Sequence, residues 1–141
     1  MTILALDIGK ARTGIAVSDP SGRVASPLTT LPTEQVVSGS KSFRDIVGDY
    51  GEPALLVGLP VSMDGEEHAQ AAWVREVAQG IAELFGLPLI FADERRSSAQ
   101  AEATLREMGY NSRSMRSRID MVAACIFLQS YLDGANQKTG G

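Results

Sequence analysis

The segment ILALDIGKARTGIAVSD, residues 3–19, decides the fold of this chain. An apolar run ends in a single acid, Asp7, and a second apolar run follows a short polar turn with Gly9 and Gly14. This pattern predicts two β-strands joined by a tight turn, in which the glycines serve either a close backbone approach or a steric turn role. A carboxylate at the end of a buried strand needs a partner. Asp7 therefore either binds a cation or caps the turn through its own backbone.

The composition indicates one globular domain. With 141 residues and 44% hydrophobic content, the chain is long enough for one core. Its longest uncharged apolar segment, residues 121–132, is shorter than the roughly 20 residues of a membrane span. A single cysteine excludes an internal disulfide framework, and no basic region precedes the first apolar residues as in a signal peptide. We expect a cytoplasmic domain over residues 1–133, no membrane contact, and a flexible polar tail over residues 134–141.

Charge is distributed unevenly along the chain. The net charge is −4, but residues 95–118 carry six arginines against two acids, so this window is +4 and the remainder −8. Segregated charge indicates either a basic face on an acidic body or an ordinary solvated helical surface. Because guanidinium groups bind phosphate bidentately, the arginine content favours anion binding.

The remaining pattern predicts an α/β fold. The expected order is β-β-β-α-β-α-β-α-α, a mixed five-stranded sheet with helices on both faces. After the first two strands, further strands are expected at residues 24–31, 53–59 and 89–92. A helix capped by Thr33 and reaching Tyr50 follows the first of these strands, and a helix that buries Trp73, Val77, Ile81 and Leu84 follows the second. The last strand is followed by a helix from Ser97 and a final helix at about residues 113–132.

Three acids lie where structural acids are not expected. Asp7 ends the first strand, Glu94 follows the last strand, and Asp120 flanks an apolar helical stripe. If the first and last strands are neighbours, Asp7 and Glu94 leave the sheet side by side. Three converging carboxylates repel one another and bind a divalent cation, and without a histidine or cysteine cluster that cation is Mg²⁺ or Mn²⁺. Such a site suits phosphodiester hydrolysis.

Each acid also has a simpler interpretation. Glu94 is able to pair with Arg95 or Arg96, and Asp93 competes with it for the ligand role. Asp120 is able to pair with an arginine one helical turn earlier in the sequence. The triplet is more specific than any one of its members.

Several blocks of sequence occur in a fixed order over residues 4–133. The blocks are Asp7-Ile-Gly9 with Arg12-Thr-Gly14, Val57-Gly-Leu-Pro60 with Met63-Asp-Gly65, Asp93-Glu-Arg95 with Ser97-Ser98, and Asp120 with Ala123-Ala124. Together they resemble the YqgF family, also called RuvX, which includes pre-16S ribosomal RNA nucleases and relatives of RuvC Holliday-junction resolvases.

The resemblance implies an RNase H-like fold and a hydrolase. The enzyme would be a metal-dependent nuclease of the cytoplasm that processes the ends of precursor 16S ribosomal RNA during ribosome biogenesis. The acids Asp7, Glu94 and Asp120 match the family's acidic residues and would be both catalytic and magnesium-binding. Met121 departs from the family, because many relatives carry lysine after this aspartate.

Basic side chains near these acids are candidates for nucleic-acid binding. Each phosphate that they neutralise releases about one counterion. The candidates are Lys10, Arg12, Arg95, Arg96, Arg113, Arg116 and Arg118. The expected partner is precursor ribosomal RNA or branched DNA, together with ribosome-assembly proteins, and the chain would act as a monomer or a homodimer.

Three other functions are compatible with parts of the sequence. A Holliday-junction DNA resolvase is the nearest alternative within the nucleases. A non-catalytic nucleic-acid-binding module in ribosome assembly or transcription is the alternative from another class, although carboxylates near phosphate would weaken such a binder. A phosphate-binding turn of a sugar kinase or actin-like ATPase ranks last, because those enzymes close two domains around ATP.

Overall fold

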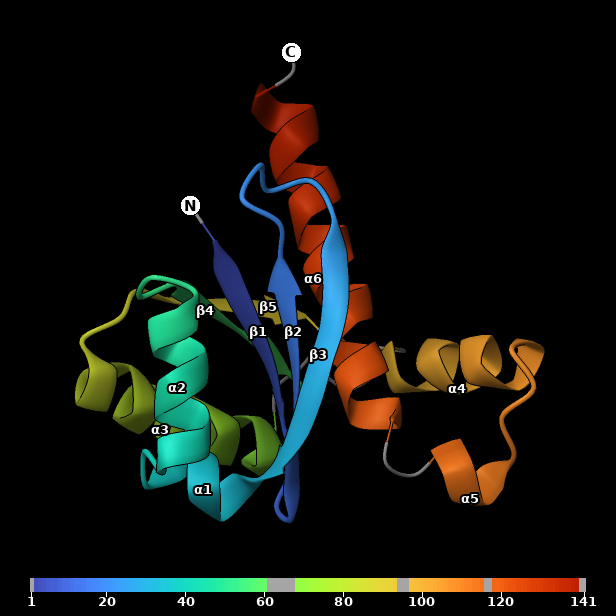
Figure 1. The fold of residues 1–141 in the computed structure, drawn as a ribbon, viewed down its shortest axis with the longest axis horizontal. Helices are drawn as coiled ribbons and strands as arrows, with labels where there is room; N and C mark the ends of the chain where they lie inside the picture. Colours follow the sequence, from blue (N-terminus) through green and yellow to red (C-terminus); the bar gives the residue numbers. More distant parts are fainter. Residues whose placement is uncertain (1, 61–67, 94–96, 116–117, 140–141) are drawn as a thin grey trace.

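The computed structural model describes residues 2–60, 68–93, 97–115 and 118–139. Within them lies a five-stranded sheet of order β3-β2-β1-β4-β5 (Figure 1). Strands β1, β2 and β3 form an antiparallel meander, whereas β4 runs parallel to β1 and β5 runs parallel to β4. The predicted mixed sheet is confirmed. The strands are β1 (Ile3–Ile8), β2 (Arg12–Ser18), β3 (Ala25–Pro32), β4 (Ala54–Leu59) and β5 (Leu89–Asp93).

Helices cover both faces of the sheet, as predicted (Figure 1). Alternate residues of β1 serve opposite faces, because successive side chains of a strand point in opposite directions. Leu4 and Leu6 join a large apolar cluster with α1, α2 and α3, whereas Ala5 packs against α6 together with Ala16. The small side chains on this second face allow α6 to lie close to the strands. The helices are α1 (Thr33–Val37), α2 (Lys41–Asp49), α3 (Ala69–Phe85), α4 (Ser97–Glu107), α5 (Ser112–Met115) and α6 (Ile119–Thr139).

The first helical region differs from the prediction of one helix capped by Thr33. Pro32 is the N-cap of α1, and Thr33 is a buried first-turn residue. The helix then ends, and α2 begins after Gly39, whose φ of 68° lies in the left-handed region. Glycine adopts this conformation without the steric penalty of other residues, so the chain breaks here into two helices.

Helix α3 buries the face formed by Val74, Ala78 and Ile81. Trp73 is partly buried against the same cluster, as predicted for a core residue. The prediction for Leu84 is wrong, because 56% of this side chain is exposed. Gly86 ends the helix with a left-handed φ of 66°, in agreement with the predicted break.

The last helical region also divides into two. The single helix predicted from about residue 113 is instead α5 and then α6. Asn111 begins α5, since its side-chain oxygen accepts hydrogen bonds from the backbone N–H groups of Arg113 and Ser114. Helix α6 extends to Thr139, while the flexibility of residues 134–141 stays a prediction. None of the helices in the described parts of the chain has the length and apolar character that a bilayer crossing requires.

Candidate active site

Asp7 and Gly14 lie opposite each other in the ladder between β1 and β2. Directly opposed residues of an antiparallel pair face the same side of the sheet. Ala5 and Ala16, which are also paired, pack against α6, and each lies two positions away from Asp7 or Gly14 on its own strand. By strand alternation, the partly buried Asp7 therefore lies on the face that α6 covers.

The start of α6 crosses directly over Gly14. A Cβ atom built on Gly14 would lie 2.1 Å from the carbonyl carbon of Asp120, 2.2 Å from its oxygen and 2.4 Å from the backbone nitrogen of Met121. Of the two roles open to Gly14, the structure therefore supports close backbone approach. Since Gly14 is also the ladder partner of Asp7, this contact brings Asp120 to the position beside Asp7.

Asp120 forms an ion pair with Arg12, which comes from the start of β2. The guanidinium Nε of Arg12 lies 3.3 Å from Oδ2 of Asp120, and the aspartate side chain is 25% exposed. Burial raises the pKa of Asp120, and the nearby Arg12 opposes this shift without overcoming it. The ionised carboxylate is therefore incompletely compensated, and a second cation at this position would stabilise it.

The first and last strands, whose adjacency would bring Asp7 and Glu94 off the sheet side by side, are not neighbours. Strand β4 lies between β1 and β5, which places two strand spacings, roughly 10 Å, between the ends of β1 and β5. Alternate residues of a strand face the same side of the sheet, so Asp93 faces the same side as Leu89 and Phe91. These two residues pack on the side of α1–α3, and Asp93 therefore lies on the face opposite to Asp7.

Glu94 itself lies outside the described residues. Among the residues that are described, no group of three histidine, cysteine, aspartate or glutamate side chains is placed to hold a metal ion. The structure thus brings together Asp7 and Asp120, and the third acid of the predicted triplet stays a prediction.

The predicted nucleic-acid-binding residues that the structure describes lie at several places. The Nζ of Lys10, in the turn between β1 and β2, lies 5.8 Å from the ring centroid of Trp73. The Arg118 guanidinium lies 5.0 Å from the ring of Tyr110, and Arg113 is exposed on α5. Arg95, Arg96 and Arg116 lie outside the described residues.

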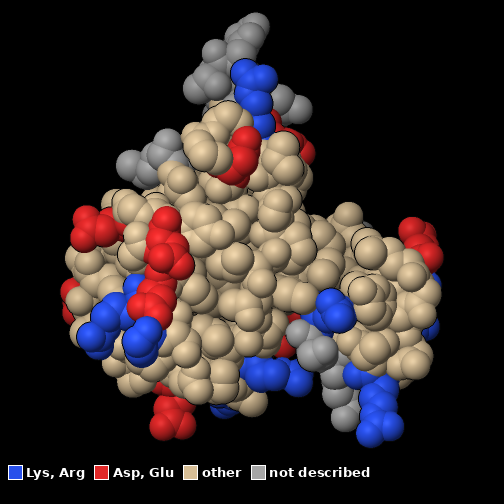
Figure 2. Space-filling model, viewed as in Figure 1, with Lys and Arg blue, Asp and Glu red and all other residues tan. Residues whose placement is uncertain are grey.

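Figure 2 shows basic side chains at scattered positions over a largely uncharged face. The arginine-rich window supplies only part of them, and Arg106, one of its members, forms an ion pair with Glu102 at 2.6 Å. This view does not display a continuous basic surface among the described residues.

A chain of buried hydroxyl groups holds the turn between β1 and β2. The Thr33 hydroxyl donates to the carbonyl of Gly9 at 2.5 Å, and it lies 2.8 Å from the hydroxyl of Thr13. Because a hydroxyl has one proton, Thr13 must be the donor to Thr33. The N–H of Gly9 closes the turn by donating to the carbonyl of Arg12 at 2.9 Å. Sequence reasoning missed this network, although a threonine at position 13 inside a buried run was a signal of it.

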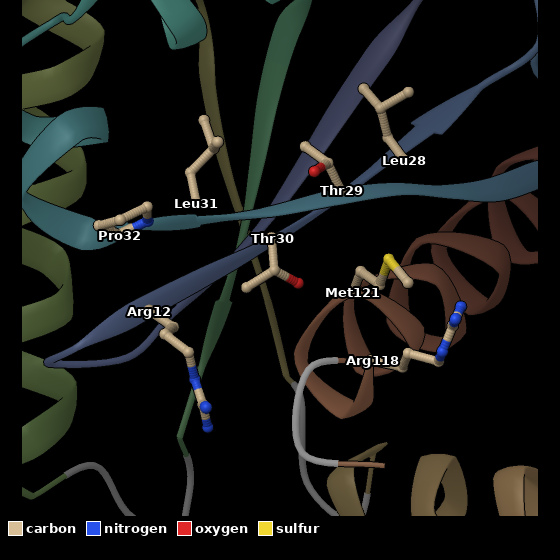
Figure 3. A pocket seen from close by; sticks show the side chains of 8 residues that line it. All are labelled: Arg12, Leu28, Thr29, Thr30, Leu31, Pro32, Arg118 and Met121. Atoms are coloured by element: carbon tan, nitrogen blue, oxygen red, sulfur yellow. The ribbon is translucent and has the colours of Figure 1, made fainter. Parts of the chain in front are cut away.

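A groove of about 410 Å³ lies between β3 and the start of α6 (Figure 3). Arg12 lies at one side of this groove and Arg118 at the other. The contribution of β3 had no signal in the sequence, because its side chains carry no charge between Leu28 and Pro32. The lining residues are Arg12, Leu28, Thr29, Thr30, Leu31, Pro32, Arg118 and Met121.

The mixed five-stranded sheet and its helices define a class of fold, that of the RuvC-like resolvases. Thermus thermophilus RuvC, solved with a Holliday junction substrate, superposes with a TM-score of 0.59 over 97% of this chain and 96% of RuvC, at 13% identity. The Fowlpox virus resolvase, solved with Holliday junction DNA, has a TM-score of 0.60 over 96% of this chain and 99% of the resolvase, at 12% identity. At such low identity the likeness establishes the shared fold.

The chain belongs to the RuvX family, whose model, described as a Holliday junction resolvase, matches residues 1–134. A protein of Chloroflexus aggregans named "Putative pre-16S rRNA nuclease" is 39% identical over 132 residues, which are 94% of this chain and 93% of that protein. A protein of the same name from Anaeromyxobacter sp. is 38% identical over 134 residues, 95% of this chain and 98% of its own. The family predicted from the sequence blocks is confirmed.

Proposed function

We propose that this chain is a metal-dependent nuclease that hydrolyses phosphodiester bonds in precursor 16S ribosomal RNA. The observation that supports the proposal is the close approach of Gly14, the ladder partner of Asp7, to the backbone of Asp120. Two acids held together at the end of a central strand would repel each other unless a cation lay between them. Membership of a family of nucleases supports the same activity.

The donor set fits Mg²⁺ or Mn²⁺. Asp7 and Asp120 supply hard carboxylate oxygens, Glu94 is the proposed third ligand, and burial leaves Asp120 incompletely compensated. When bound, the metal would activate a water molecule and stabilise the leaving oxygen of the phosphodiester. Arg12, already in contact with Asp120, is placed to bind the non-bridging oxygens of the same phosphate, and Lys10 lies in the adjoining turn.

The names of the relatives support an RNA substrate. A cytoplasmic location and ribosome-assembly partners are part of the same proposal. Cleavage of a Holliday junction is the second candidate, supported by the description of the family model and by the resolvases that share the fold. A monomer would suffice to trim an RNA end, whereas a junction resolvase needs two sites in a dimer. Light scattering coupled to gel filtration measures the oligomeric state.

The proposal is tested by cleavage of labelled precursor 16S ribosomal RNA, single-stranded RNA and a four-way DNA junction. Each substrate is incubated with Mg²⁺, Mn²⁺ or EDTA, with the wild type and with Asp7→Asn. Asp49→Asn, which changes an exposed acid at the end of α2, is the matched control. We expect cutting that requires metal, disappears in Asp7→Asn and persists in Asp49→Asn.

The preferred substrate distinguishes RNA processing from junction resolution. Cutting that survives Asp7→Asn would contradict the proposed site. Binding without cutting, unaffected by metal or by Asp7→Asn, would instead indicate a non-catalytic binding module.

A further inference from the structure

The groove between β3 and α6 opens directly beside the proposed catalytic carboxylates. Arg12 lines the groove and also pairs with Asp120. A nucleic-acid strand whose reacting phosphate lay beside Asp120 would therefore extend into the groove. Strand β3 is the outermost strand at this side of the sheet, and the groove follows the part of β3 nearest to Arg12. Its volume of about 410 Å³ lies within the range usual for ligand sites.

The charges of the groove suit a polyanion. Arg12 and Arg118 are both exposed and lie on opposite sides of it, the first from β2 and the second just ahead of α6 (Figure 3). No acidic side chain is among the described residues that line the groove. Two guanidinium groups set apart in this way suit two phosphates of one backbone.

The rest of the lining suits the sugar and base between two phosphates. Met121 projects from α6 toward β3, and the Thr30 hydroxyl points toward Met121 (Figure 3). Pro32 adds further apolar surface at the end of β3. In a duplex the flat faces of the bases are stacked against one another, whereas a single strand is able to lay the face of an unstacked base on apolar surface.

We propose that this groove is a binding subsite for a single-stranded segment of nucleic acid next to the cleaved phosphodiester, with Arg12 and Arg118 on consecutive phosphates and Met121 beneath the nucleotide between them. The inference rests on the proposed nuclease function, since it names the form of substrate that the same site takes. It assigns a contact role to Met121 and to β3.

The test measures binding of a fluorescent 12-nucleotide RNA by anisotropy in EDTA, so that no cleavage is needed. A blunt duplex of the same sequence is measured in parallel. Met121→Glu places a negative charge in the groove, and Met108→Glu makes the same change at an exposed methionine outside it. Arg118→Ala removes a charge from the groove, and Arg23→Ala removes one at the exposed far end of the β2–β3 hairpin.

We expect Met121→Glu to weaken single-strand binding at least tenfold and Met121→Lys to strengthen it. Arg118→Ala should weaken it several-fold and reduce the slope of log K against log salt by about 0.7. The two control variants should change binding less than twofold, and duplex binding should change less than single-strand binding. Thermal unfolding verifies that each variant is folded, and Met121→Lys keeps the test informative if Met121→Glu does not fold.

Equal weakening by the groove variants and their controls would overturn the inference, and so would equal loss of duplex binding. The result is separable from the nuclease proposal. A protein that cuts RNA but binds it unchanged in Met121→Glu retains the proposed function and loses the subsite. A protein that shows the expected binding pattern but cuts nothing retains the subsite and loses the proposed function.

Discussion

Gly14→Ala tests the contact on which the candidate site is built. The new methyl group would lie 2.1 Å from the carbonyl carbon of Asp120, whereas ordinary contact begins at 3.4 Å. The start of α6 or strand β2 must therefore move by about 1.3 Å. The neighbours are backbone atoms, so no side-chain rotation relieves the clash. The φ of Gly14 is not in the left-handed region, and the effect is thus steric.

Overpacking typically lowers the free energy of unfolding by about 1–3 kcal/mol, and a clash between backbone atoms lies at or above the upper end of this range. We expect Gly14→Ala to lower the free energy of unfolding by about 3 kcal/mol, measured by urea denaturation. A displacement of about 1 Å in a catalytic group also lowers the rate by about 100-fold, and cleavage should fall at least this far.

Gly80→Ala is the matched control. Gly80 lies within α3, and a Cβ there would meet nothing within 4 Å. Since alanine has the higher helix propensity, this variant should be more stable by up to about 1 kcal/mol. If the free energy of unfolding of Gly14→Ala lies within about 0.5 kcal/mol of the wild type and its cleavage rate is unchanged, α6 does not press on Gly14 and the proposed site is refuted.

Three further variants test electrostatics and packing. The Ser21 hydroxyl and two backbone N–H groups lower the pKa of Asp19 from 3.8 to about 2, so the stability that they confer is present above pH 4 and is lost as the pH falls toward 2. Asp19→Asn should flatten the stability profile in that window, and an unchanged profile would contradict the assignment. Burial raises the pKa of Asp120, so its ionised form destabilises the metal-free protein at neutral pH. Asp120→Asn should raise the melting temperature without metal and abolish the rise produced by Mg²⁺, and a lower melting temperature would refute this. The side-chain oxygen of Gln129 accepts a hydrogen bond from Ala25 N–H, and its side-chain nitrogen donates one to the carbonyl of Arg23, each at 2.9 Å. Gln129→Leu should therefore lower the free energy of unfolding by about 1–3 kcal/mol in urea denaturation. A loss below about 0.5 kcal/mol would contradict this role.

The sheet was predictable because its strands carry strong local patterns. The apolar runs on either side of the glycine-bearing turn, and the continuous run of β4, specify strands without reference to the rest of the chain. The order of strands in the sheet is a property of packing. Nothing local in the sequence placed β4 between β1 and β5, so the sequence left open whether the first and last strands are neighbours.

The helix boundaries were predicted less well, for physical reasons that the structure makes plain. Thr33 has the chemistry of a cap, but its hydroxyl is used by Gly9 and Thr13 instead. Leu84 has helical spacing with the buried residues of α3, yet its side chain is largely exposed beside Gly39. In both cases a contact far along the sequence overrides a local preference.

For the candidate site, the sequence pointed to individual acids but not to their partners. Asp7 and Asp120 stood out as acids in apolar surroundings, and the structure brings them together. The partner of Asp120 proved to be Arg12, which is 108 positions earlier in the sequence. The groove formed by β3 had no signal in the sequence, because its threonine and apolar side chains are ordinary for an edge strand.

The crossing of α6 over Gly14 determines when the candidate site is assembled during synthesis of the chain. Asp7 leaves the ribosome early, whereas Asp120 lies on the last helix, so the two halves of the site are made far apart in time. A nascent chain that has already built β1 and β2 still lacks the helix that completes the pair of acids. The contact between Gly14 and Asp120 therefore forms only when α6 docks, after the whole sheet has been synthesised.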